Sequence, residues 1–293
     1  MLSYLRRQLR DLLELFMLPA LSLLFSWRTC FKLFKWLCRF DFFYKDHVDS
    51  AFENALNLGV LSLEDSREWR QKIRLTRLID LADFYLTLFK GDKWLAKNVK
   101  MQGEWPAHGA GFLCTFHWGG GMWAIRSARI SGLTPHMMLA RFDPVHFKNQ
   151  PVLLHYAKYR TAVVERETGF QTIDPKQARP AIQKALEIGN QVMVVMDVPP
   201  DAVRSTVPVM IVDRQVRMPI GLLKMAVQSK VPVTIFSMGY DFETGVRLLS
   251  VRNLPLIEDS LQLATTVYDE LDSLIQRDPA LWHFWAQMPR FMA

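Results

Sequence analysis

Hydrophobic residues are spaced in two different ways along the chain, and the change falls near residue 110. Between residues 50 and 100 they recur at helical spacing among charged residues, as in S-R-E-W-R-Q-K-I-R-L-T-R-L-I-D-L at 66–81. From Gly111 onward they form short continuous runs, the first being G-F-L-C-T-F at 111–116. Such runs are typical of strands that are covered on both faces of a sheet. The pattern therefore predicts helices first and a sheet afterwards.

Apolar runs and helical patterns alternate through the rest of the chain. The further runs are H-M-M-L-A (136–140), F-Q-T-I (170–173), Q-V-M-V-V-M (191–196), V-P-V-M-I-V (207–212), V-P-V-T-I-F-S-M (231–238) and V-R-L-L-S-V (246–251). Helical patterns cover residues 151–165, 179–190, 220–229 and 260–277. Strands that alternate with helices in this way predict an α/β fold, with a mostly parallel central sheet flanked by helices.

The first 45 residues differ from the rest in charge and in hydrophobicity. They hold eight basic residues against three acidic ones, so most of the net charge of +7 lies there. Leu, Phe and Trp are interleaved with these charges, which argues against a nucleic-acid partner and favours amphipathic helices in the interface of an anionic membrane. We therefore expect membrane-associated helices over residues 1–45 and one α/β domain over 46–293.

A spanning helix and a helical hairpin packed on the domain are the alternatives for this N-terminal segment. Its apolar stretch, residues 12–27, contains Glu14 and is interrupted by Pro19. A spanning helix usually needs about 20 apolar residues, which is longer than this stretch. The stretch also lacks the small-residue cleavage site of a signal peptide. A membrane partner contacted at the interface is the interpretation that the sequence favours.

Cysteine usage points to a reducing compartment. Cys30, Cys38 and Cys114 are too few and too scattered for a disulfide framework or a zinc site. Cys114 lies inside an apolar run, where a cysteine usually serves as a small core residue. We expect no metal site and a location facing the cytosol.

Two polar residues directly follow apolar runs, where open α/β sheets place their ligands. His117 follows F-L-C-T-F and Asp197 follows V-M-V-V-M. A histidine can take a proton from a hydroxyl near neutral pH, and a carboxylate can fix its tautomer. The structural alternatives are a strand-end histidine without chemistry and an aspartate that caps a helix. Neither a dinucleotide-binding G-x-G-x-x-G nor a serine-nucleophile G-x-S-x-G motif is present.

Several motifs occur together in a fixed order. They are Leu18–Pro19, N-A-L-N-L-G (54–59), T-F-H-W-G-G-G-M-W (115–123), Asp143–Pro144 with V-E-R-E-T-G-F (164–170), K-A-L-E-I-G-N-Q-V-M-V-V-M-D (184–197), V-P-V-M-I-V-D-R-Q-V-R-M-P-I-G (207–221) and R-D-P-A-L-W-H-F-W (277–285). In order and spacing, this set resembles the bacterial lipid A late acyltransferases of the lauroyl/myristoyl type. That family is a branch of the lysophospholipid acyltransferase superfamily, and the resemblance covers almost the whole chain.

The resemblance implies a glycerolipid-acyltransferase-like fold and an acyl transfer at the cytoplasmic face of the bacterial inner membrane. The acyl group would pass from an acyl-carrier-protein or coenzyme A thioester to a hydroxyl of a lipid or lipid-like acceptor. His117 would be the general base with Asp197 as its partner, and no metal or further cofactor would be needed. The N–H groups of the glycine run, with Gly119 and Gly120, would hold the oxyanion.

Four further residues enter through the same resemblance. Arg166, in R-E-T-G, and Arg160 would hold a phosphate of the donor or the acceptor, with a solvated helix face as the alternative for each. Trp118 and Trp123 would line the substrate groove.

Met122 departs from the family, which has an acid five residues after its histidine. Asp197 replaces that acid as the partner of His117 in the first explanation. In the second, His117 works without a carboxylate; in the third, the protein is an inactive, lipid-binding or assembly relative. The altered pocket also allows an acceptor other than lipid A, such as another lipid or polyene carrier.

Overall fold

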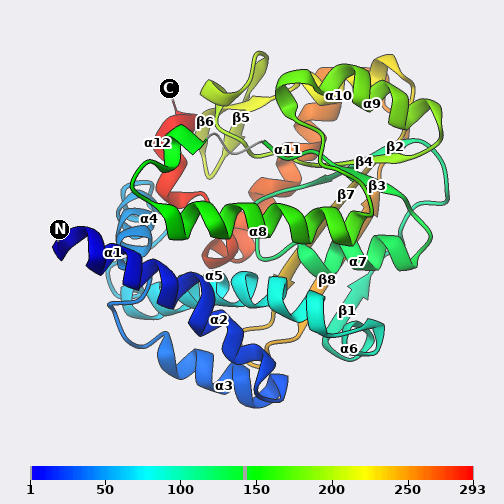
Figure 1. Ribbon diagram of the computed structural model, residues 1–293. Helices are drawn as coiled ribbons and strands as arrows, with labels where there is room; N and C mark the ends of the chain where they lie inside the picture. Colours follow the sequence, from blue (N-terminus) through cyan, green and yellow to red (C-terminus); the bar gives the residue numbers. More distant parts are fainter. Residues whose placement is uncertain (1, 141–143, 293) are drawn as a thin grey trace.

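A mostly parallel sheet, in the order β1-β8-β7-β2-β4-β3, forms the centre of the molecule (Figure 1). The structure is a computed structural model that describes residues 2–140 and 144–292. Within these residues the sheet has six strands, namely β1 (Val99–Gln102), β2 (Gly111–Thr115), β3 (Pro135–Met137), β4 (Gln191–Val195), β7 (Val233–Tyr240) and β8 (Arg247–Asn253). β2 runs parallel to β4 and β7, and β3 runs parallel to β4; only the β7–β8 pairing of the described sheet is antiparallel. The predicted α/β fold is confirmed.

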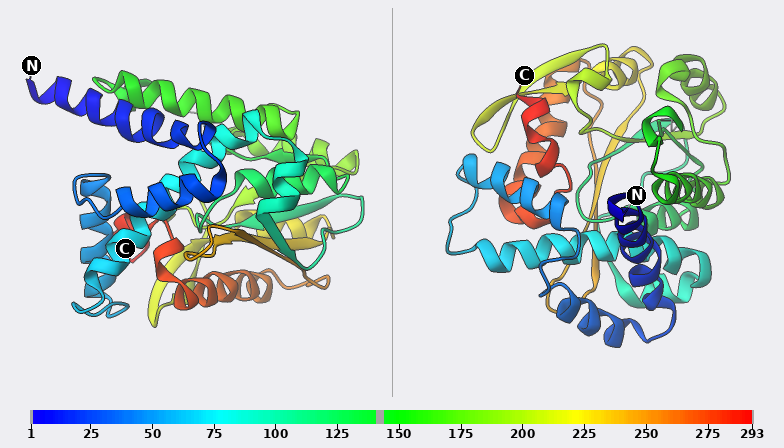
Figure 2. Two further views of the ribbon diagram at one scale, coloured as in Figure 1. Left: turned by 90° about the horizontal axis from the view of Figure 1, so that it is seen from below. Right: turned by 60° about the vertical axis from the view of Figure 1, so that its left-hand side comes forward.

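Helices cover both faces of this sheet. They are α4 (Lys45–Asn57), α5 (Ser66–Phe89), α6 (Asp92–Asn98), α7 (Met122–Ile130), α8 (Pro151–Thr168), α9 (Ala178–Glu187), α10 (Gly221–Gln228), α11 (Ser260–Arg277) and α12 (Met288–Phe291). The left view of Figure 2 shows α11 on one side of the sheet and α5 and α8 on the other. The helical patterns at 151–165, 179–190, 220–229 and 260–277 correspond to α8, α9, α10 and α11.

Two apolar runs take a different structure from the predicted one. F-Q-T-I contributes one isolated bridge, between Ile173 and Met138, because its neighbours turn away from the sheet. V-P-V-M-I-V forms β5 (Thr206–Ile211), which pairs with β6 (Arg214–Pro219) in an antiparallel hairpin outside the central sheet. The strands β1 and β6 were not predicted, because V-K-M-Q and R-Q-V-R-M-P alternate apolar with polar residues and carry no continuous apolar run.

The N-terminal helices pack on the domain. α1 (Leu2–Leu12) continues through a π-helical turn, Leu13–Met17, into α2 (Leu18–Ala20). This wider turn precedes Pro19, which has no N–H to continue the α-helical bonding. α1 contacts α8, while α2 contacts α5. No helix in the described part of the chain is both long enough and apolar enough to cross a bilayer.

α3 (Trp27–Leu37) shares its core with the sheet. Trp27, Phe31 and Phe34 are buried, and they belong to the same hydrophobic cluster as the strands. The Trp27 indole Nε1 donates to the Gly245 carbonyl, at 2.8 Å, in the turn before β8. The N-terminal segment is therefore joined to the α/β domain by a buried apolar contact and a buried hydrogen bond.

Candidate active site

The register of β2 and β4 brings His117 and Asp197 together. Thr115 pairs with Val195 in this parallel ladder, so the residues two positions further along each chain leave the sheet side by side. His117 Nδ1 lies 3.0 Å from Asp197 Oδ1. The backbone N–H of His117 also donates to the same carboxylate, at 2.8 Å to Oδ1 and 3.0 Å to Oδ2. The two side chains are thus within hydrogen-bond reach at the carboxyl edge of the sheet.

Asp197 acts as an acceptor in this arrangement. Its carboxylate is fully buried, and its Oδ2 also accepts from the Trp282 indole Nε1 at 2.8 Å. A backbone N–H and an indole N–H can only donate, so both oxygens serve as acceptors. Nδ1 of His117 therefore carries the hydrogen that it shares with Asp197, and Nε2 is left with the lone pair.

The C-terminal segment holds the imidazole from its other side. The Phe284 ring stacks on the His117 ring, with centroids 4.0 Å apart and planes inclined by 17°. The His283 N–H donates to the His117 carbonyl at 2.8 Å, so the backbone is fixed as well. About a third of the His117 side chain remains exposed, at 33%. The ring is held on two sides and open on a third, as a proton-transferring group requires.

Close packing explains two of the three glycines of the run, Gly119 and Gly120. Gly119 has a φ of +67°, and a Cβ built there would lie 2.0 Å from the Met238 carbonyl oxygen. A Cβ on Gly120 would lie 2.3 Å from the Tyr240 hydroxyl. No larger residue fits at either position without movement of the loop or of β7.

The N–H groups of these two glycines are already bonded within the protein. Gly119 donates to the Leu281 carbonyl at 2.7 Å, and Gly120 donates to the Met238 carbonyl at 2.9 Å. The expectation that these groups hold an oxyanion is therefore not met in this structure. The N–H groups that begin α7 immediately afterwards have no intrahelical acceptor, as in the first turn of any helix.

Met122 is a core residue. It is the first residue of α7, and only 2% of it is exposed. No acid stands at this position, and the carboxylate that contacts His117 in the described structure is that of Asp197. The geometry matches the first of the three explanations for the departure from the family.

Trp118 and Trp123 are buried, at 5% and 0% exposure, so neither indole faces an open groove. The Trp118 ring packs so closely on Gly239 that a Cβ there would lie 2.7 Å from it, and the Arg277 guanidinium lies 5.4 Å from its centre. Trp123 stacks on Trp94 instead, at 4.4 Å and 18°. The groove expected above these indoles is filled by the C-terminal segment and by α6.

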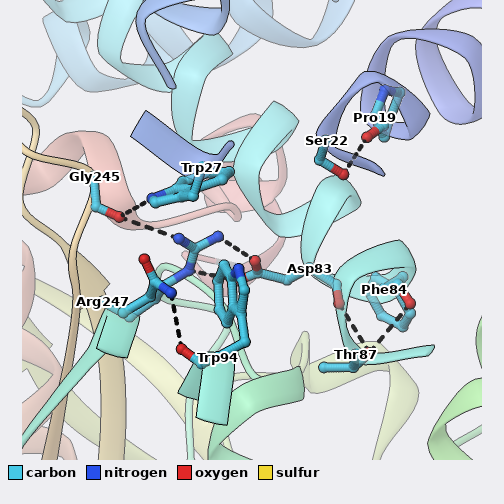
Figure 3. A network of polar contacts seen from close by, with 10 residues as sticks. Pro19, Ser22, Trp27, Asp83, Phe84, Thr87, Trp94, Gly245 and Arg247 are labelled. Atoms are coloured by element: carbon cyan, nitrogen blue, oxygen red, sulfur yellow. Dashed lines mark hydrogen bonds and ion pairs between the residues drawn. The ribbon is translucent and has the colours of Figure 1, made fainter. Parts of the chain in front are cut away.

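Trp94 belongs to a column of stacked side chains (Figure 3). The Arg247 guanidinium lies between the Trp27 ring, at 3.8 Å, and the Trp94 ring, at 4.8 Å. It also forms a fully buried ion pair with Asp83, and burial raises the pKa of that carboxyl. The column thus runs from α3 through the buried pair to Trp123, the second residue of the helix that follows the glycine run.

The two candidate arginines on α8 do not converge. Arg160 turns toward α5, where its Nη2 lies 3.4 Å from Asp80 Oδ2 and its guanidinium lies 4.3 Å from the Phe84 ring centre. Arg166 is exposed in the last turn of the helix. Six residues of an α-helix separate the two by roughly 120° around its axis, so they cannot clamp one phosphate from the same side.

A polar face of α5 was not foreseen. Arg77 and Asp80, one turn apart on α5, both act electrostatically on His283, and Arg77 also acts on His47 of α4. Burial lowers the pKa of His47 to about 3, and Arg77 and His283 add to this effect. Burial also lowers the pKa of His283, whose Nε2–H donates to the Gly119 carbonyl at 2.6 Å. In the sequence, charged residues recur every three positions along 74–83, and this helical spacing could have indicated a polar face.

Other kinds of catalytic group find no support in the described residues. The three cysteines are free and buried, and burial raises the pKa of each to about 12, so they are protonated thiols at neutral pH. No group of three or more His, Cys, Asp or Glu in the described ranges is placed to hold a metal ion. Asp143, which carries part of one motif, lies outside the described residues.

Comparison with known proteins adds no family assignment. No protein-family model matches the chain, and no curated protein matches it. The resemblance to the lipid A late acyltransferases therefore rests on the order of its motifs.

Proposed function

We propose that the protein is a membrane-associated O-acyltransferase. It would move an acyl group from an acyl-carrier-protein or coenzyme A thioester to a hydroxyl of a lipid or lipid-like acceptor. The observation that carries this proposal is the His117 imidazole, bonded through Nδ1 to the buried Asp197 and open to solvent on one side. This is the arrangement that a general base for hydroxyl activation needs.

The chemistry follows from the tautomer. Nε2 of His117 takes the proton of the acceptor hydroxyl while the hydroxyl oxygen attacks the thioester carbonyl. Asp197 stabilises the imidazolium that forms. The tetrahedral intermediate then breaks its C–S bond, and the imidazolium returns the proton to the departing thiolate. The products are an ester and a free thiol, and neither a covalent acyl-enzyme nor a metal is needed.

The oxyanion of the intermediate would be held by the first N–H groups of α7. This helix begins five residues after His117, and its N-terminal N–H groups and dipole favour negative charge. Arg160 is oriented by Asp80 and the Phe84 ring, and we propose it, in preference to the exposed Arg166, as a ligand for a phosphate.

A membrane partner is supported by the surface of the N-terminal helices. Large apolar side chains are exposed there, namely Tyr4, Leu5, Leu9, Leu12, Met17, Leu24, Phe25, Trp36, Phe40 and Phe42. Arg6, Arg28, Lys32 and Arg39 are exposed among them. Apolar side chains flanked by cations suit an interface with anionic lipids, and we propose the cytoplasmic face of a bacterial inner membrane.

The test is a screen of purified protein with acyl-carrier-protein and coenzyme A thioesters against lipid acceptors. Release of free thiol that depends on an acceptor supports the proposal. The alternative, an inactive lipid-binding or assembly relative, has Met122 in its favour. It predicts lipid that co-purifies with the protein and no thiol release with any donor.

A further inference from the structure

A basic cavity of about 560 Å³ lies between the β5–β6 hairpin, the turn at Pro200–Ala202 and α12. Its charged lining residues are Asp201, Arg204, Arg217 and Arg290. A volume of this size is typical of pockets that hold small ligands.

Two of its three arginines have no acidic partner among the described residues. Arg290 binds Asp201 through two hydrogen bonds, of 3.0 and 2.6 Å, so these two charges neutralise each other. Arg217 is oriented by a bond from its Nε to Thr206 Oγ1, at 3.0 Å, which leaves its terminal nitrogens unused. Arg204 has no hydrogen bond or ion pair with any described residue. Two guanidinium groups at one cavity provide the charge and the paired donors that a phosphate takes.

The cavity adjoins the candidate active site along two parts of the chain. Asp197 precedes the lining residue Pro200 by three positions. On the other side, Phe284 stacks on His117 and packs against Phe291, with ring centroids 6.2 Å apart. Phe291 directly follows the lining residue Arg290. Short segments of the chain therefore connect the lining of the cavity to the residues that hold His117.

We infer that this cavity binds the phosphate of the donor's pantetheine arm, an inference that rests on the proposed acyl transfer. Acyl-carrier-protein and coenzyme A thioesters share this arm. Its sulfur carries the acyl group at one end, and its phosphate lies at the other. A donor of this kind calls for a phosphate site that is distinct from the His117–Asp197 pair, as this cavity is.

The position of the hairpin favours the donor over the lipid acceptor. In Figure 1 and in the right view of Figure 2, the β5–β6 hairpin lies at the opposite end of the molecule from α3. α3 and the segment after it carry Trp36, Phe40 and Phe42, part of the proposed membrane contact. A lipid would approach from that end, and a water-soluble donor would approach from the hairpin.

Binding to the His117→Ala variant, measured by calorimetry, tests this inference without turnover. The probes are 4′-phosphopantetheine and pantetheine, which differ in the phosphate alone. We expect pantetheine to bind about tenfold or more weaker. The double variant Arg204→Glu/Arg217→Glu should weaken the binding of 4′-phosphopantetheine by at least a similar factor. The double variant Arg204→Gln/Arg217→Gln should also weaken it, although it removes the two positive charges without adding negative ones. Arg214, exposed on the same hairpin but not lining the cavity, supplies the control Arg214→Glu, expected within about twofold of the parent.

Equal binding of the two probes, or an equal loss in Arg214→Glu, would overturn the inference. Kinetics of the active protein distinguish a donor site from an acceptor site. The cavity variants should raise the KM for the thioester and leave the KM for the lipid unchanged. The reverse result contradicts the inference and leaves the proposed acyl transfer intact. Binding of coenzyme A tighter than 4′-phosphopantetheine identifies the nucleotide carrier, and tighter binding of holo-acyl-carrier-protein identifies the protein carrier. Phosphate-dependent binding by a protein that releases no thiol would instead contradict the acyl transfer.

Discussion

At the scale of single residues, the site depends on one buried carboxylate that accepts hydrogen bonds from several directions. Asp197 fixes the His117 backbone, its Nδ1–H and the Trp282 indole at the same time. This chain therefore combines the orientation of the base and the anchoring of the loop in a single side chain.

Replacing Asp197 with asparagine should separate these two functions. The amide keeps one acceptor oxygen, but its NH₂ cannot accept from Nδ1–H and favours the other tautomer, with the hydrogen on Nε2. We expect kcat for thiol release to fall by about 10²–10⁴-fold. Asp213→Asn, an exposed position in the turn of the β5–β6 hairpin, is the matched control. Activity of Asp197→Asn equal to that of the control would remove Asp197 from the mechanism.

Gly119 and Gly121 form a second pair of matched positions. At Gly119 a Cβ meets the Met238 carbonyl at 2.0 Å and φ is +67°, whereas Gly121 has open space within 4 Å and an ordinary φ of −129°. Gly119→Ala should lower the melting temperature and displace His117, since the left-handed conformation alone costs about 1–2 kcal/mol. Gly121→Ala should melt close to the parent. Thermal unfolding followed by circular dichroism checks both, and equal melting temperatures would contradict the packing described for the loop.

At the scale of elements, the buried Arg247–Asp83 pair joins β8 to α5 inside the Trp27–Trp94 sandwich. Both side chains are 0% exposed. Arg247→Met should destabilise the fold by about 3–5 kcal/mol, because it leaves the Asp83 carboxylate buried without a counter-charge. Arg247→Met/Asp83→Asn should recover most of that loss, since no charge then remains buried. Denaturant unfolding measures both, and a double variant no more stable than the single one would argue against the pair as the cause.

Glu14 gives the N-terminal helices a dependence on pH. Its carboxylate is buried and accepts from the Tyr44 N–H at 2.7 Å, and burial raises its pKa above the usual 4.5. A carboxyl with a raised pKa in the folded state stabilises the fold below its unfolded pKa and loses that contribution as pH rises through the folded value. Glu14→Gln keeps the acceptor without the charge. It should raise the melting temperature at neutral pH by about 2–4 °C, the effect of about 1 kcal/mol in a chain of this size, and the gain should vanish near pH 4.

At the scale of the whole molecule, the proposed membrane contact consists of α1, α3 and the segment after α3. The exposed rings of Trp36, Phe40 and Phe42 lie within 6.1 Å of their neighbours and form one aromatic cluster. Replacing all three with serine should weaken binding to phosphatidylglycerol vesicles by tenfold or more, on the order of the apolar area lost. Leu63→Ser/Phe89→Ser/Leu261→Ser removes equally exposed apolar groups elsewhere. Equal losses in the two triple variants, measured by co-sedimentation, would contradict a contact through the N-terminal helices.

Much of this architecture is visible in the sequence because it depends on local patterns. Buried strands such as β2 and β4 appear in the sequence as apolar runs. His117 and Asp197 could be selected because each directly follows one of these runs. Their contact depends on β2 and β4 being neighbours in the sheet, and a local sequence pattern does not specify which strands pair.

The contributions of the C-terminal segment lay beyond what the sequence alone reveals. Trp282 contacts Asp197 across 85 residues of the chain, and Phe284 contacts His117 from still further away. Their motif R-D-P-A-L-W-H-F-W has no local signal for those contacts. The hydrogen bonds of the glycine run are non-local in the same way. Gly119 and Gly120 donate to the carbonyls of Leu281 and Met238, and no local pattern in the sequence contains those contacts.

Thiol release by the wild-type protein and by His117→Ala tests the proposed role of His117 as the base of an acyl transfer. Both proteins would be given the same acyl-carrier-protein or coenzyme A thioester and the same lipid acceptor. We expect acceptor-dependent thiol release by the wild type and a loss of about 10²–10⁴-fold in His117→Ala. Full activity of His117→Ala would contradict it.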